Sequence, residues 1–225
     1  MEVIERRKDG RLPNEVRATE IKIGVIQGAK GSCMVQKNRT KIISSVQVSS
    51  IDESDFEFKC TVSFPRFAPE TPQLKRKEIE ATEVLEQALK GRVLPENNSG
   101  LKIELKSFVL EEDGGVKDSV ITSGALALFD ADVRIDDIII ASSVVKMNNF
   151  KRCLVDPTSQ EEDDKVGSVL IASVPSTNSI TQIFMSGVLQ PNDISECLAV
   201  AMDECWKINE IVQKIREQRK QKMEQ

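Results

Sequence analysis

The chain has 225 residues and is 40% hydrophobic, which is enough to bury a sizeable core as one large domain or two small ones. Its 31 basic and 36 acidic residues give a net charge of -5, which excludes a general nucleic-acid polycation, so any RNA contact needs a local basic patch. The complete absence of histidine excludes Ser-His and Cys-His nucleophile pairs and histidine metal sites.

A charged segment opens the chain. Residues 6–17, RRKDGRLPNEVR, contain a turn at Asp9 and Gly10, and Pro13 prevents an early helix. We expect this segment to lie on the surface.

Four strands are predicted before residue 65. Residues 20–48 contain three alternating or β-branched runs, separated by turns at 28–31 and 37–39, which predicts three short antiparallel strands. The fourth strand shows the cleanest period of two in the chain. One face of this predicted strand carries Phe56, Phe58, Cys60, Val62 and Phe64.

Residues 74–92 are predicted to form an amphipathic helix, because their apolar side chains recur every three or four positions. The basic triplet Lys75, Arg76 and Lys77 falls in or just before its first turn. Cations at a helix N-terminus are disfavoured by a few tenths of a kcal/mol up to about 1 kcal/mol. The triplet therefore either serves an anion or forms a solvated basic face, and the residues alone leave both possibilities open.

The rest of the chain is expected to pack around the segment Glu111–Leu128. An acidic strand end runs through Gly114 and Gly115 into a helix that is apolar on nearly every side, so we predict a central core helix. The glycines permit a tight turn whose free amides can receive an anion, as in a phosphate loop. A strand-to-helix turn without a ligand is the more common use of such a pair.

The remaining chain is predicted to add strands and one long helix. The second of these strands is nearly continuously apolar, which predicts cover on both faces. The predicted elements are strands at 101–110 and 137–147, a closing segment at 153–157, a hairpin of 166–174 with 180–185 around a turn at 175–178, and one long C-terminal helix from 194 whose end frays into 216–225.

Neither a metal site nor a disulfide framework is predicted. Residues 160–165, QEEDDK, are expected to form an acidic loop, and such runs are more often solvated than bound to a divalent cation. The cysteines are odd in number and include no C-x-x-C pair, which argues against disulfides and structural zinc and indicates a reducing compartment. They are Cys33, Cys60, Cys153, Cys197 and Cys205.

The sequence shows no targeting or membrane-spanning segment. The start MEVIERR lacks an apolar signal-peptide core, and no run of about 18 or more apolar residues occurs, so we expect an intracellular, soluble protein. The order of predicted elements is strands, helix, strand, helix, strands, helix. This order predicts a mixed α+β fold in a single domain spanning residues 1–225.

Six short motifs occur in order over nearly the whole chain. They are D-G-R-x-x-N-E-x-R from Asp9, G-V-x-x-A-x-G-S from Gly24, Thr40-Lys41-Ile42, L-E-E-D-G-G from Leu110, A-L-A-L-F-D-A from Ala125 and L-V-D-P-T-x-x-E-E from Leu154. Each is weak alone, but the ordered set resembles the ribonuclease PH-like subunits of the RNA exosome.

Within that family the chain looks like the branch that includes the archaeal catalytic ring subunit. The motif around Asp156 and the strand at 56–67 look most like the eukaryotic messenger-RNA-transport-type ring subunit, which is not catalytic. The resemblance implies a ribonuclease PH-like fold of two β-α modules, packed face to face, with mixed sheets and a long C-terminal helix. It also implies a six-membered ring around an RNA channel, bound by S1/KH-type cap subunits, in nucleus, nucleolus and cytoplasm.

The resemblance also locates the family's catalytic positions. In this family, arginines and a helix-start loop hold the phosphate that attacks the last phosphodiester of the RNA, near an aspartate. The arginine pair corresponds to Arg76 and Lys77, and the loop to residues 115–117, where valine removes a hydroxyl donor and lysine replaces an arginine fork. The aspartate corresponds to Ser168, and the usual Pro-Arg before the strand at 101 is replaced by an insertion around 97–99.

We therefore predict a non-catalytic ring subunit without cofactor or metal, which completes the ring, seats the cap subunits and helps thread RNA during RNA processing, rRNA processing and degradation. The predicted RNA-binding residues are Lys75, Arg76, Lys77 and Lys117. The alternative is an active 3′-to-5′ phosphorolytic exoribonuclease that uses Asp163 or Asp164. A stand-alone RNA-binding protein is disfavoured by the acidic net charge and the lack of an aromatic nucleic-acid motif.

Overall fold

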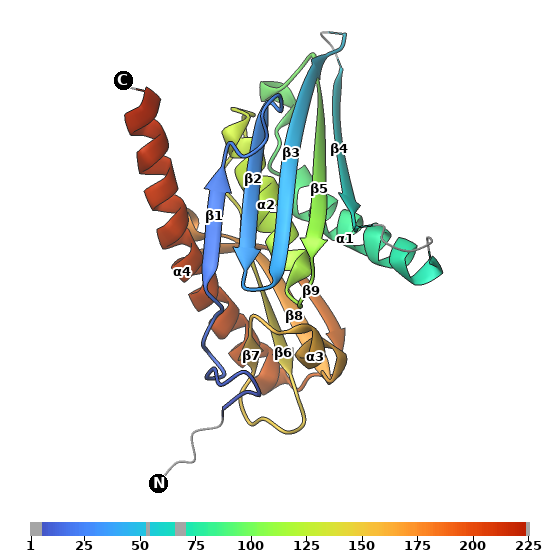
Figure 1. The fold of residues 1–225 in the computed structure, drawn as a ribbon, viewed down its shortest axis with the longest axis vertical. Coiled ribbons are helices and arrows are strands. Elements are labelled where there is room, and N and C mark those ends of the chain that lie inside the picture. The colour runs from blue at the N-terminus through green and yellow to red at the C-terminus, as the bar shows by residue number, and fades with distance from the viewer. Residues whose placement is uncertain (1–5, 53–54, 66–70, 224–225) are drawn as a thin grey trace.

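The computed structural model describes residues 6–52, 55–65 and 71–223, and it contains two sheets with a helix between them (Figure 1). The first sheet has the strand order β1-β2-β3-β5-β4. Its strands are β1 (Thr19–Ile23), β2 (Gly31–Lys37), β3 (Thr40–Ser50), β4 (Phe56–Ser63) and β5 (Leu101–Glu111). Strands β4 and β5 are parallel and all other neighbours are antiparallel, so β4 needs a crossover, which contains helix α1 (Pro72–Lys90).

The second sheet is antiparallel and has the order β7-β6-β8-β9. Its strands are β6 (Ile140–Lys146), β7 (Leu154–Val155), β8 (Gly167–Val174) and β9 (Ser179–Gly187). A short 3-10 turn at Pro175–Thr177 joins β8 to β9 and ends at Asn178, whose φ of 51° is left-handed. The predicted hairpin is therefore confirmed.

Helix α2 (Val116–Asp130) is the central core element, as its all-round apolar sequence predicts. Every residue from Asp118 to Leu128 is buried, because the helix packs against β2, β3 and β5 of one sheet and β6 and β8 of the other. Gly31 lies against its C-terminal end, where an added Cβ would approach the amide nitrogen of Ala131 to 2.2 Å. A larger residue at position 31 would therefore separate the first sheet from its core helix.

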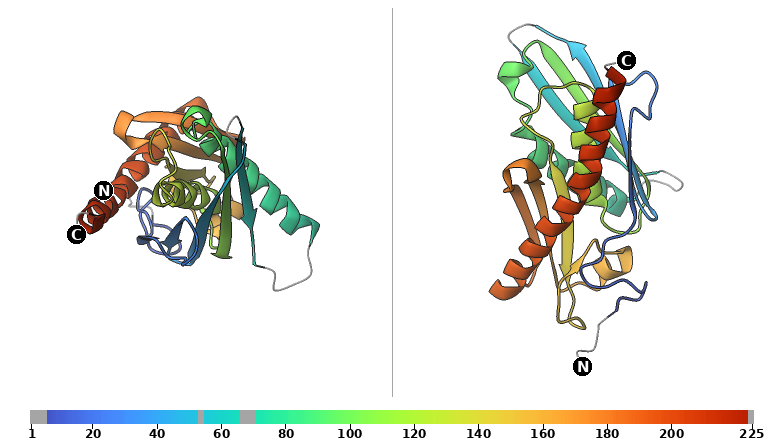
Figure 2. Two further views of the ribbon diagram at one scale, coloured as in Figure 1. Left: turned by 90° about the horizontal axis from the view of Figure 1, so that it is seen from above. Right: turned by 90° about the vertical axis from the view of Figure 1, so that its left-hand side faces the viewer.

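Helix α4 (Pro191–Met223) begins three residues before the predicted start and stays helical through most of the end that was expected to fray, and it spans both sheets (Figure 2). Its first half packs on β6 and β8, and the helix also contacts β1. Near its end, Arg219 donates to the carbonyl oxygens of Phe129 and Asp130 at 2.6 and 2.9 Å. These carbonyls belong to the last turn of α2, where helix geometry leaves them without an intrahelical donor. Arg219 therefore supplies hydrogen bonds to both of them and links α4 to α2.

The charged segment at 6–17 does not lie wholly on the surface, contrary to the sequence-based expectation. Arg7 and Arg17 are only 3% and 5% exposed. Both side chains donate to the segment at 155–157, and this pairing offsets the cost of burying their charge.

The acidic run at 160–165 also differs from its prediction as a loop. Residues Ser159–Asp163 form the short helix α3, which starts with a capping box between Thr158 and Glu161. The T-x-x-E spacing was the local sequence signal for this helix start. The capping hydrogen bonds that it provides favour a helix more strongly than the run of carboxylates favours a loop. No helix among the described residues is long and apolar enough to cross a membrane.

Candidate functional site

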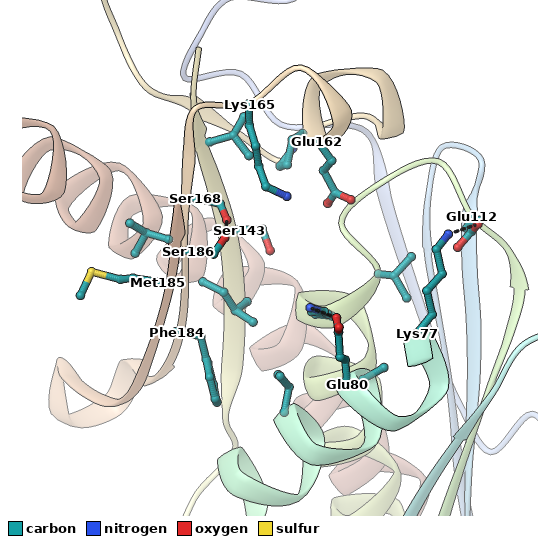
Figure 3. A pocket seen from close by; sticks show the side chains of 18 of the residues that line it. Lys77, Glu80, Glu112, Ser143, Glu162, Lys165, Ser168, Phe184, Met185 and Ser186 are labelled. Carbon is teal, nitrogen blue, oxygen red and sulfur yellow. Dashed lines mark hydrogen bonds and ion pairs between the residues drawn. The ribbon is translucent and has the colours of Figure 1, made fainter. Parts of the chain in front are cut away.

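A cleft of about 510 Å³ lies between the middle of α1 and the first turn of α2 on one side and β8 and β9 on the other (Figure 3). Lys77 and Glu80 enter it from α1, and Glu162 and Lys165 point into it from the opposite side. Lys117 and Ser168 also line it. The fold therefore brings together the positions that the family resemblance assigns to phosphate binding and to the catalytic aspartate.

The start of α2 has the geometry of an anion site, but a carboxylate of the chain occupies it. Gly114 and Gly115 have left-handed φ angles of 76° and 62°, which aim the first amides of the helix at the cleft wall. The Gly115 N–H donates to Glu162 Oε1 at 2.9 Å. Burial raises the pKa of Glu162 above its ordinary value. An internal carboxylate thus lies where the resemblance implies a bound phosphate.

The cations of the cleft are paired in a similar way. Lys77 Nζ lies 2.9 Å from Glu112 Oε1, and Lys117 Nζ lies 3.4 Å from Glu80 Oε2. Glu80 also accepts from Arg76 at 3.1 Å, one helical turn away. Both lysines line the cleft, whereas Lys75 and Arg76 are exposed on the helix outside it. Of the four predicted RNA-binding residues, the structure brings Lys77 and Lys117 together and leaves Lys75 and Arg76 at the margin.

The position that corresponds to the catalytic aspartate carries no charge. Ser168 Oγ lies 2.8 Å from Ser186 Oγ on the neighbouring strand β9. A hydroxyl lacks the basicity of a carboxylate and cannot replace it as a general base. Asp163 and Asp164, the alternative carboxylates, are exposed at the end of α3 and do not line the cleft.

The balance of charge in the cleft is unfavourable for a polyanion. Four glutamates and three lysines line the cleft among the described residues, and Glu162 is one of these glutamates, so the described lining carries no net positive charge at neutral pH. These residues are Glu80, Glu83, Glu112 and Glu162, against Lys77, Lys117 and Lys165. Sequence reasoning missed the glutamates, although Glu80 is three and four positions after two of the predicted cations, a spacing that favours ion pairs on a helix.

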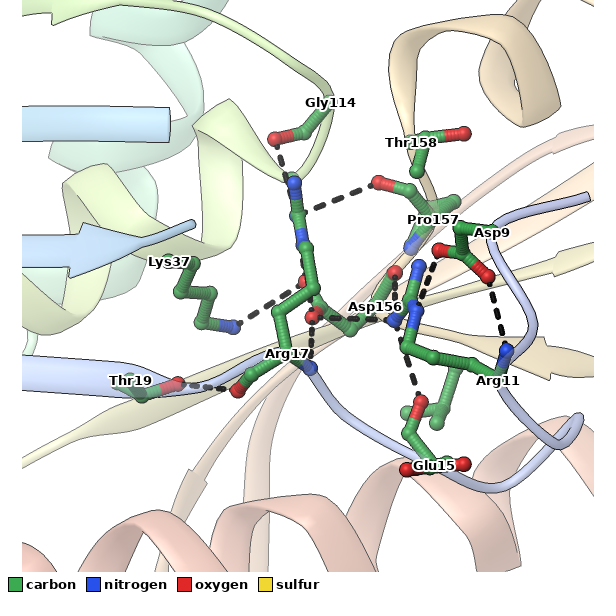
Figure 4. A network of polar contacts seen from close by, with 12 residues as sticks. Asp9, Arg11, Glu15, Arg17, Thr19, Lys37, Gly114, Asp156, Pro157 and Thr158 are labelled. Atoms are coloured by element: carbon green, nitrogen blue, oxygen red, sulfur yellow. Dashed lines mark hydrogen bonds and ion pairs between the residues drawn. The ribbon is translucent and has the colours of Figure 1, made fainter. Parts of the chain in front are cut away.

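A buried ionic network supports the wall behind the start of α2 (Figure 4). The Asp156 carboxylate accepts from Arg17 Nη2 at 2.6 Å and lies 3.8 Å from Lys37 Nζ. Burial opposes its ionisation, but Lys37 and Arg17 together hold the pKa of Asp156 well below its usual range. Arg17 also donates to the carbonyl oxygens of Asp113 and Gly114. The network therefore fixes the glycine turn against the segment after β7.

Two groups of described residues bring possible metal ligands within 4.8 Å of one another, and neither lines the cleft. In the first group, Asp118 and Glu204 surround the Lys37 ammonium at 2.7 and 2.9 Å, together with Asp156. The lysine supplies the positive charge that a metal would bring. The second group, around Cys153, includes Asp193, which is paired with Lys146 at 3.0 Å.

Comparisons with curated proteins find relatives that cover most of the chain. The exosome complex component RRP41-like of Arabidopsis thaliana is 29% identical over 212 residues, which are 92% of this chain and 82% of that protein. The exosome complex component Rrp41 of Cenarchaeum symbiosum is 25% identical over 218 residues, covering 92% and 89%.

Solved structures share the fold. The crystal structure of rice (Oryza sativa) Rrp46 has a TM-score of 0.79 at 15% identity, covering 92% of this chain and 98% of that chain. A chain of the Archaeoglobus fulgidus exosome with RNA bound to the active site has a TM-score of 0.77 at 22% identity, covering 92% of each. These likenesses confirm the predicted ribonuclease PH-like fold.

The two halves of the chain match the two domains of one family. Residues 15–134 match domain 1 of the 3′ exoribonuclease family, and residues 137–204 match its domain 2. The first match ends just after α2 and the second begins just before β6, so each covers one of the two sheets. On this evidence of sequence and fold, the chain belongs to the 3′ exoribonuclease family of ribonuclease PH-like proteins.

Proposed function

We propose that this protein is a non-catalytic subunit of an RNA exosome ring, with a structural and RNA-threading role in 3′-to-5′ RNA processing and degradation. The observation that carries the proposal is the contact between Glu162 and the Gly115 amide, which fills the phosphate position with a carboxylate of the chain itself. Phosphorolysis needs a free phosphate site and a group that assists attack on the last phosphodiester. In this chain the phosphate site is occupied by Glu162, and the position of the assisting group carries Ser168, which has no charge.

The exosome assignment is supported by the names of the relatives, which are exosome components, and by the fold shared with an archaeal exosome chain. In this proposal the partners are other ribonuclease PH-like subunits in a hexameric ring, S1/KH-type cap subunits and RNA, without a membrane. Its place is the nucleus, nucleolus and cytoplasm. The messenger-RNA-transport type remains our assignment within the ring.

An active phosphorolytic exoribonuclease subunit is the second candidate. It is favoured by the Rrp41 name of several relatives and by the three lysines that line the cleft. Against it stand the four glutamates among the described lining residues and the pairing of Lys77 and Lys117 with glutamates.

A degradation assay separates the two candidates. The purified chain, alone and in its complex, is incubated with unstructured 3′-labelled RNA, phosphate and magnesium. We expect the purified chain by itself to release no nucleoside diphosphates, so any release by the complex should come from its other subunits. Release by the purified chain alone that requires phosphate and is lost in Arg76→Ala or Lys117→Ala would overturn the non-catalytic assignment.

A further inference from the structure

Two buried thiols touch at the join between the second sheet and α4. Cys153 lies just before β7, and Cys197 lies in the second turn of α4. Their Sγ atoms are 2.7 Å apart, about 0.7 Å more than the ~2.04 Å of a disulfide bond. No other pair of cysteines among the described residues shares such a contact. The fold has therefore placed two thiols 44 positions apart in sequence almost within bonding distance.

The surrounding polar groups hold this pair in place. The Cys153 N–H donates to Glu196 Oε1 at 3.2 Å, and its thiol lies 3.6 Å from the carbonyl oxygen of Asp193. The hydrogen bond between the thiols lowers the pKa of Cys197 and raises that of Cys153. Because the thiolate is the reactive form, Cys197 is the better nucleophile of the two.

We propose that Cys153 and Cys197 form a reversible dithiol–disulfide site that is oxidised by a peroxide. The Cys197 sulfur attacks one peroxide oxygen, the O–O bond breaks, and one water leaves, giving a sulfenic acid. The Cys153 sulfur then attacks the Cys197 sulfur, the S–O bond breaks, and a second water carries away the remaining proton and oxygen. Two thiols and one hydrogen peroxide thus become one disulfide and two waters, and a thiol reductant such as glutathione reverses the change.

The oxidant reaches the pair through the edge of the sheet. Both cysteines are almost fully buried, and β7 is only two residues long and pairs with β6 through two residue pairs. Its other side is held by the segment 7–17, where the Pro13 carbonyl oxygen accepts from the Val155 N–H at 3.0 Å. Oxidation therefore requires local opening of this short strand and is slow. The disulfide closes the loop from 153 to 197, which contains α3, β8 and β9 and hence one wall of the cleft.

The test is to treat the folded, reduced wild-type chain with hydrogen peroxide, block free thiols under denaturing conditions, and map the peptides by mass spectrometry. We expect two of the five thiols to become protected, with a linked peptide that joins Cys153 to Cys197. Cross-linking a loop of this length is expected to raise the Tm by about 5–10 °C, and a reductant should restore the original value.

Single variants locate the reaction. Cys153→Ser and Cys197→Ser should give no linked peptide and no shift in Tm, whereas Cys205→Ser, another buried thiol on α4, should behave as wild type. Oxidation of the urea-unfolded chain should give a mixture of disulfides, because only the folded structure holds the Cys153 and Cys197 sulfurs next to each other. A folded wild-type protein that links a different pair, or that keeps both thiols free until it is oxidised to sulfinic acid, would overturn the proposal.

Discussion

At the residue scale, the buried charges around Lys37 connect the two sheets. The Lys37 side chain is 2% exposed, and its ammonium lies within 4 Å of the carboxylates of Asp118, Asp156 and Glu204. Asp156 is also paired with Arg17 and Arg11, at 2.6 and 3.5 Å, whereas among the described residues Lys37 is the one cation within 4 Å of the Glu204 carboxylate. Burial and the neighbouring carboxylates single out Glu204, whose pKa is raised to about 7.

This raised pKa predicts a loss of stability as the pH increases. Folded Glu204 holds its proton up to about pH 7, whereas the unfolded carboxyl releases it near its ordinary value of 4.5. The stabilisation is therefore present below pH 4.5 and is lost as the pH rises towards 7, by about 1–3 kcal/mol in the free energy of unfolding. Urea unfolding from pH 5 to pH 7.5 should show this fall in wild type and a much flatter profile in Glu204→Gln.

The chain offers a clean background for that experiment, because it has no histidine to titrate in the same range. Glu162, whose pKa is also raised by burial, contributes a fall of the same sign and should remain in the variant. An unchanged slope in Glu204→Gln, or a wild-type stability that rises with pH over this range, would contradict the assignment.

A second residue-scale prediction concerns the anion position at the start of α2. Removing the Glu162 carboxylate frees the Gly115 amide and reduces the negative charge of the cleft, so Glu162→Ala should bind inorganic phosphate at least about tenfold more tightly than wild type. Asp163→Ala, which removes an exposed carboxylate from the same short helix, is the matched control. Calorimetric titration at neutral pH measures both, and equal affinities in wild type and Glu162→Ala would show that the carboxylate does not block the site.

At the element scale, the join between β5 and α2 depends on backbone space as well as on φ. Gly114 and Gly10 both have left-handed φ angles, of 76° and 89°. An added Cβ at Gly114 would lie 2.4 Å from the carbonyl oxygen of Pro157, whereas at Gly10 it would meet nothing within 4 Å. An alanine at Gly10 would therefore suffer only the strain of a left-handed φ, whereas an alanine at Gly114 would suffer that strain and a steric clash with the backbone.

Gly10→Ala is expected to cost about 1–2 kcal/mol of unfolding free energy, which is the strain of a left-handed L-residue. Gly114→Ala should cost more than about 3 kcal/mol, because the segment 157–159 must also move. Urea denaturation of both variants measures the difference. Equal losses would mean that the turn adapts and that contact with Pro157 does not hold the helix start.

The basic start of α1 gives a prediction about RNA. In the assembled complex, replacing Lys75, Arg76 and Lys77 with alanine should weaken RNA binding across unrelated sequences, because phosphate contacts read no bases. Each lost phosphate contact should lower the salt dependence, the slope of log K against log salt, by about 0.7 for a single strand. The ion pairs of Arg76 and Lys77 with glutamates reduce the effect expected of each residue.

The matched control replaces three lysines on the outer face of the first sheet, where they alternate with buried residues of β5 or extend from β4. These are Lys59, Lys102 and Lys106. Fluorescence anisotropy at several salt concentrations compares the two triple variants. If both lose affinity equally, the effect is general charge, and the α1 triplet is a solvated basic face.

At the scale of the whole molecule, the unpaired edge of the second sheet favours assembly. Among the strands that the structure describes, β9 pairs only with β8, and Ile183 and Met185 on it are 44% and 58% exposed. Val188, which follows the strand, is 71% exposed. Exposed apolar side chains on an edge strand are typical of a surface that a partner covers.

We expect the isolated chain to self-associate and to form a stable pair when mixed with a different ribonuclease PH-like subunit. Substituting Ile183 and Met185 with lysine should weaken that pairing, while Phe108→Lys, an exposed apolar position on the other sheet, serves as the control. Sedimentation velocity measures both. A wild-type chain that remains a stable monomer in the presence of such a partner would count against the ring assignment.

The single-domain prediction for residues 1–225 stays a prediction.

The sequence by itself determined the elements and the family. Period-two alternation located β4, all-round apolarity identified α2 as the core helix, and six ordered motifs pointed to the ribonuclease PH-like fold. Local patterns suffice here, because strand and helix periodicity are properties of neighbouring residues. The same patterns placed Lys77, Lys117 and Ser168 at one site through the family resemblance.

Only the tertiary structure decided how the charges are paired. The contacts of Arg17 with Asp156, of Lys37 with Glu204 and of Gly115 with Glu162 join residues that are 139, 167 and 47 positions apart. A segment that is charged in sequence can therefore be buried, and a helix start that resembles a phosphate loop can be filled by a distant glutamate. Electrostatic partners are set by distance through space in a medium of low dielectric constant, and no local pattern records that distance.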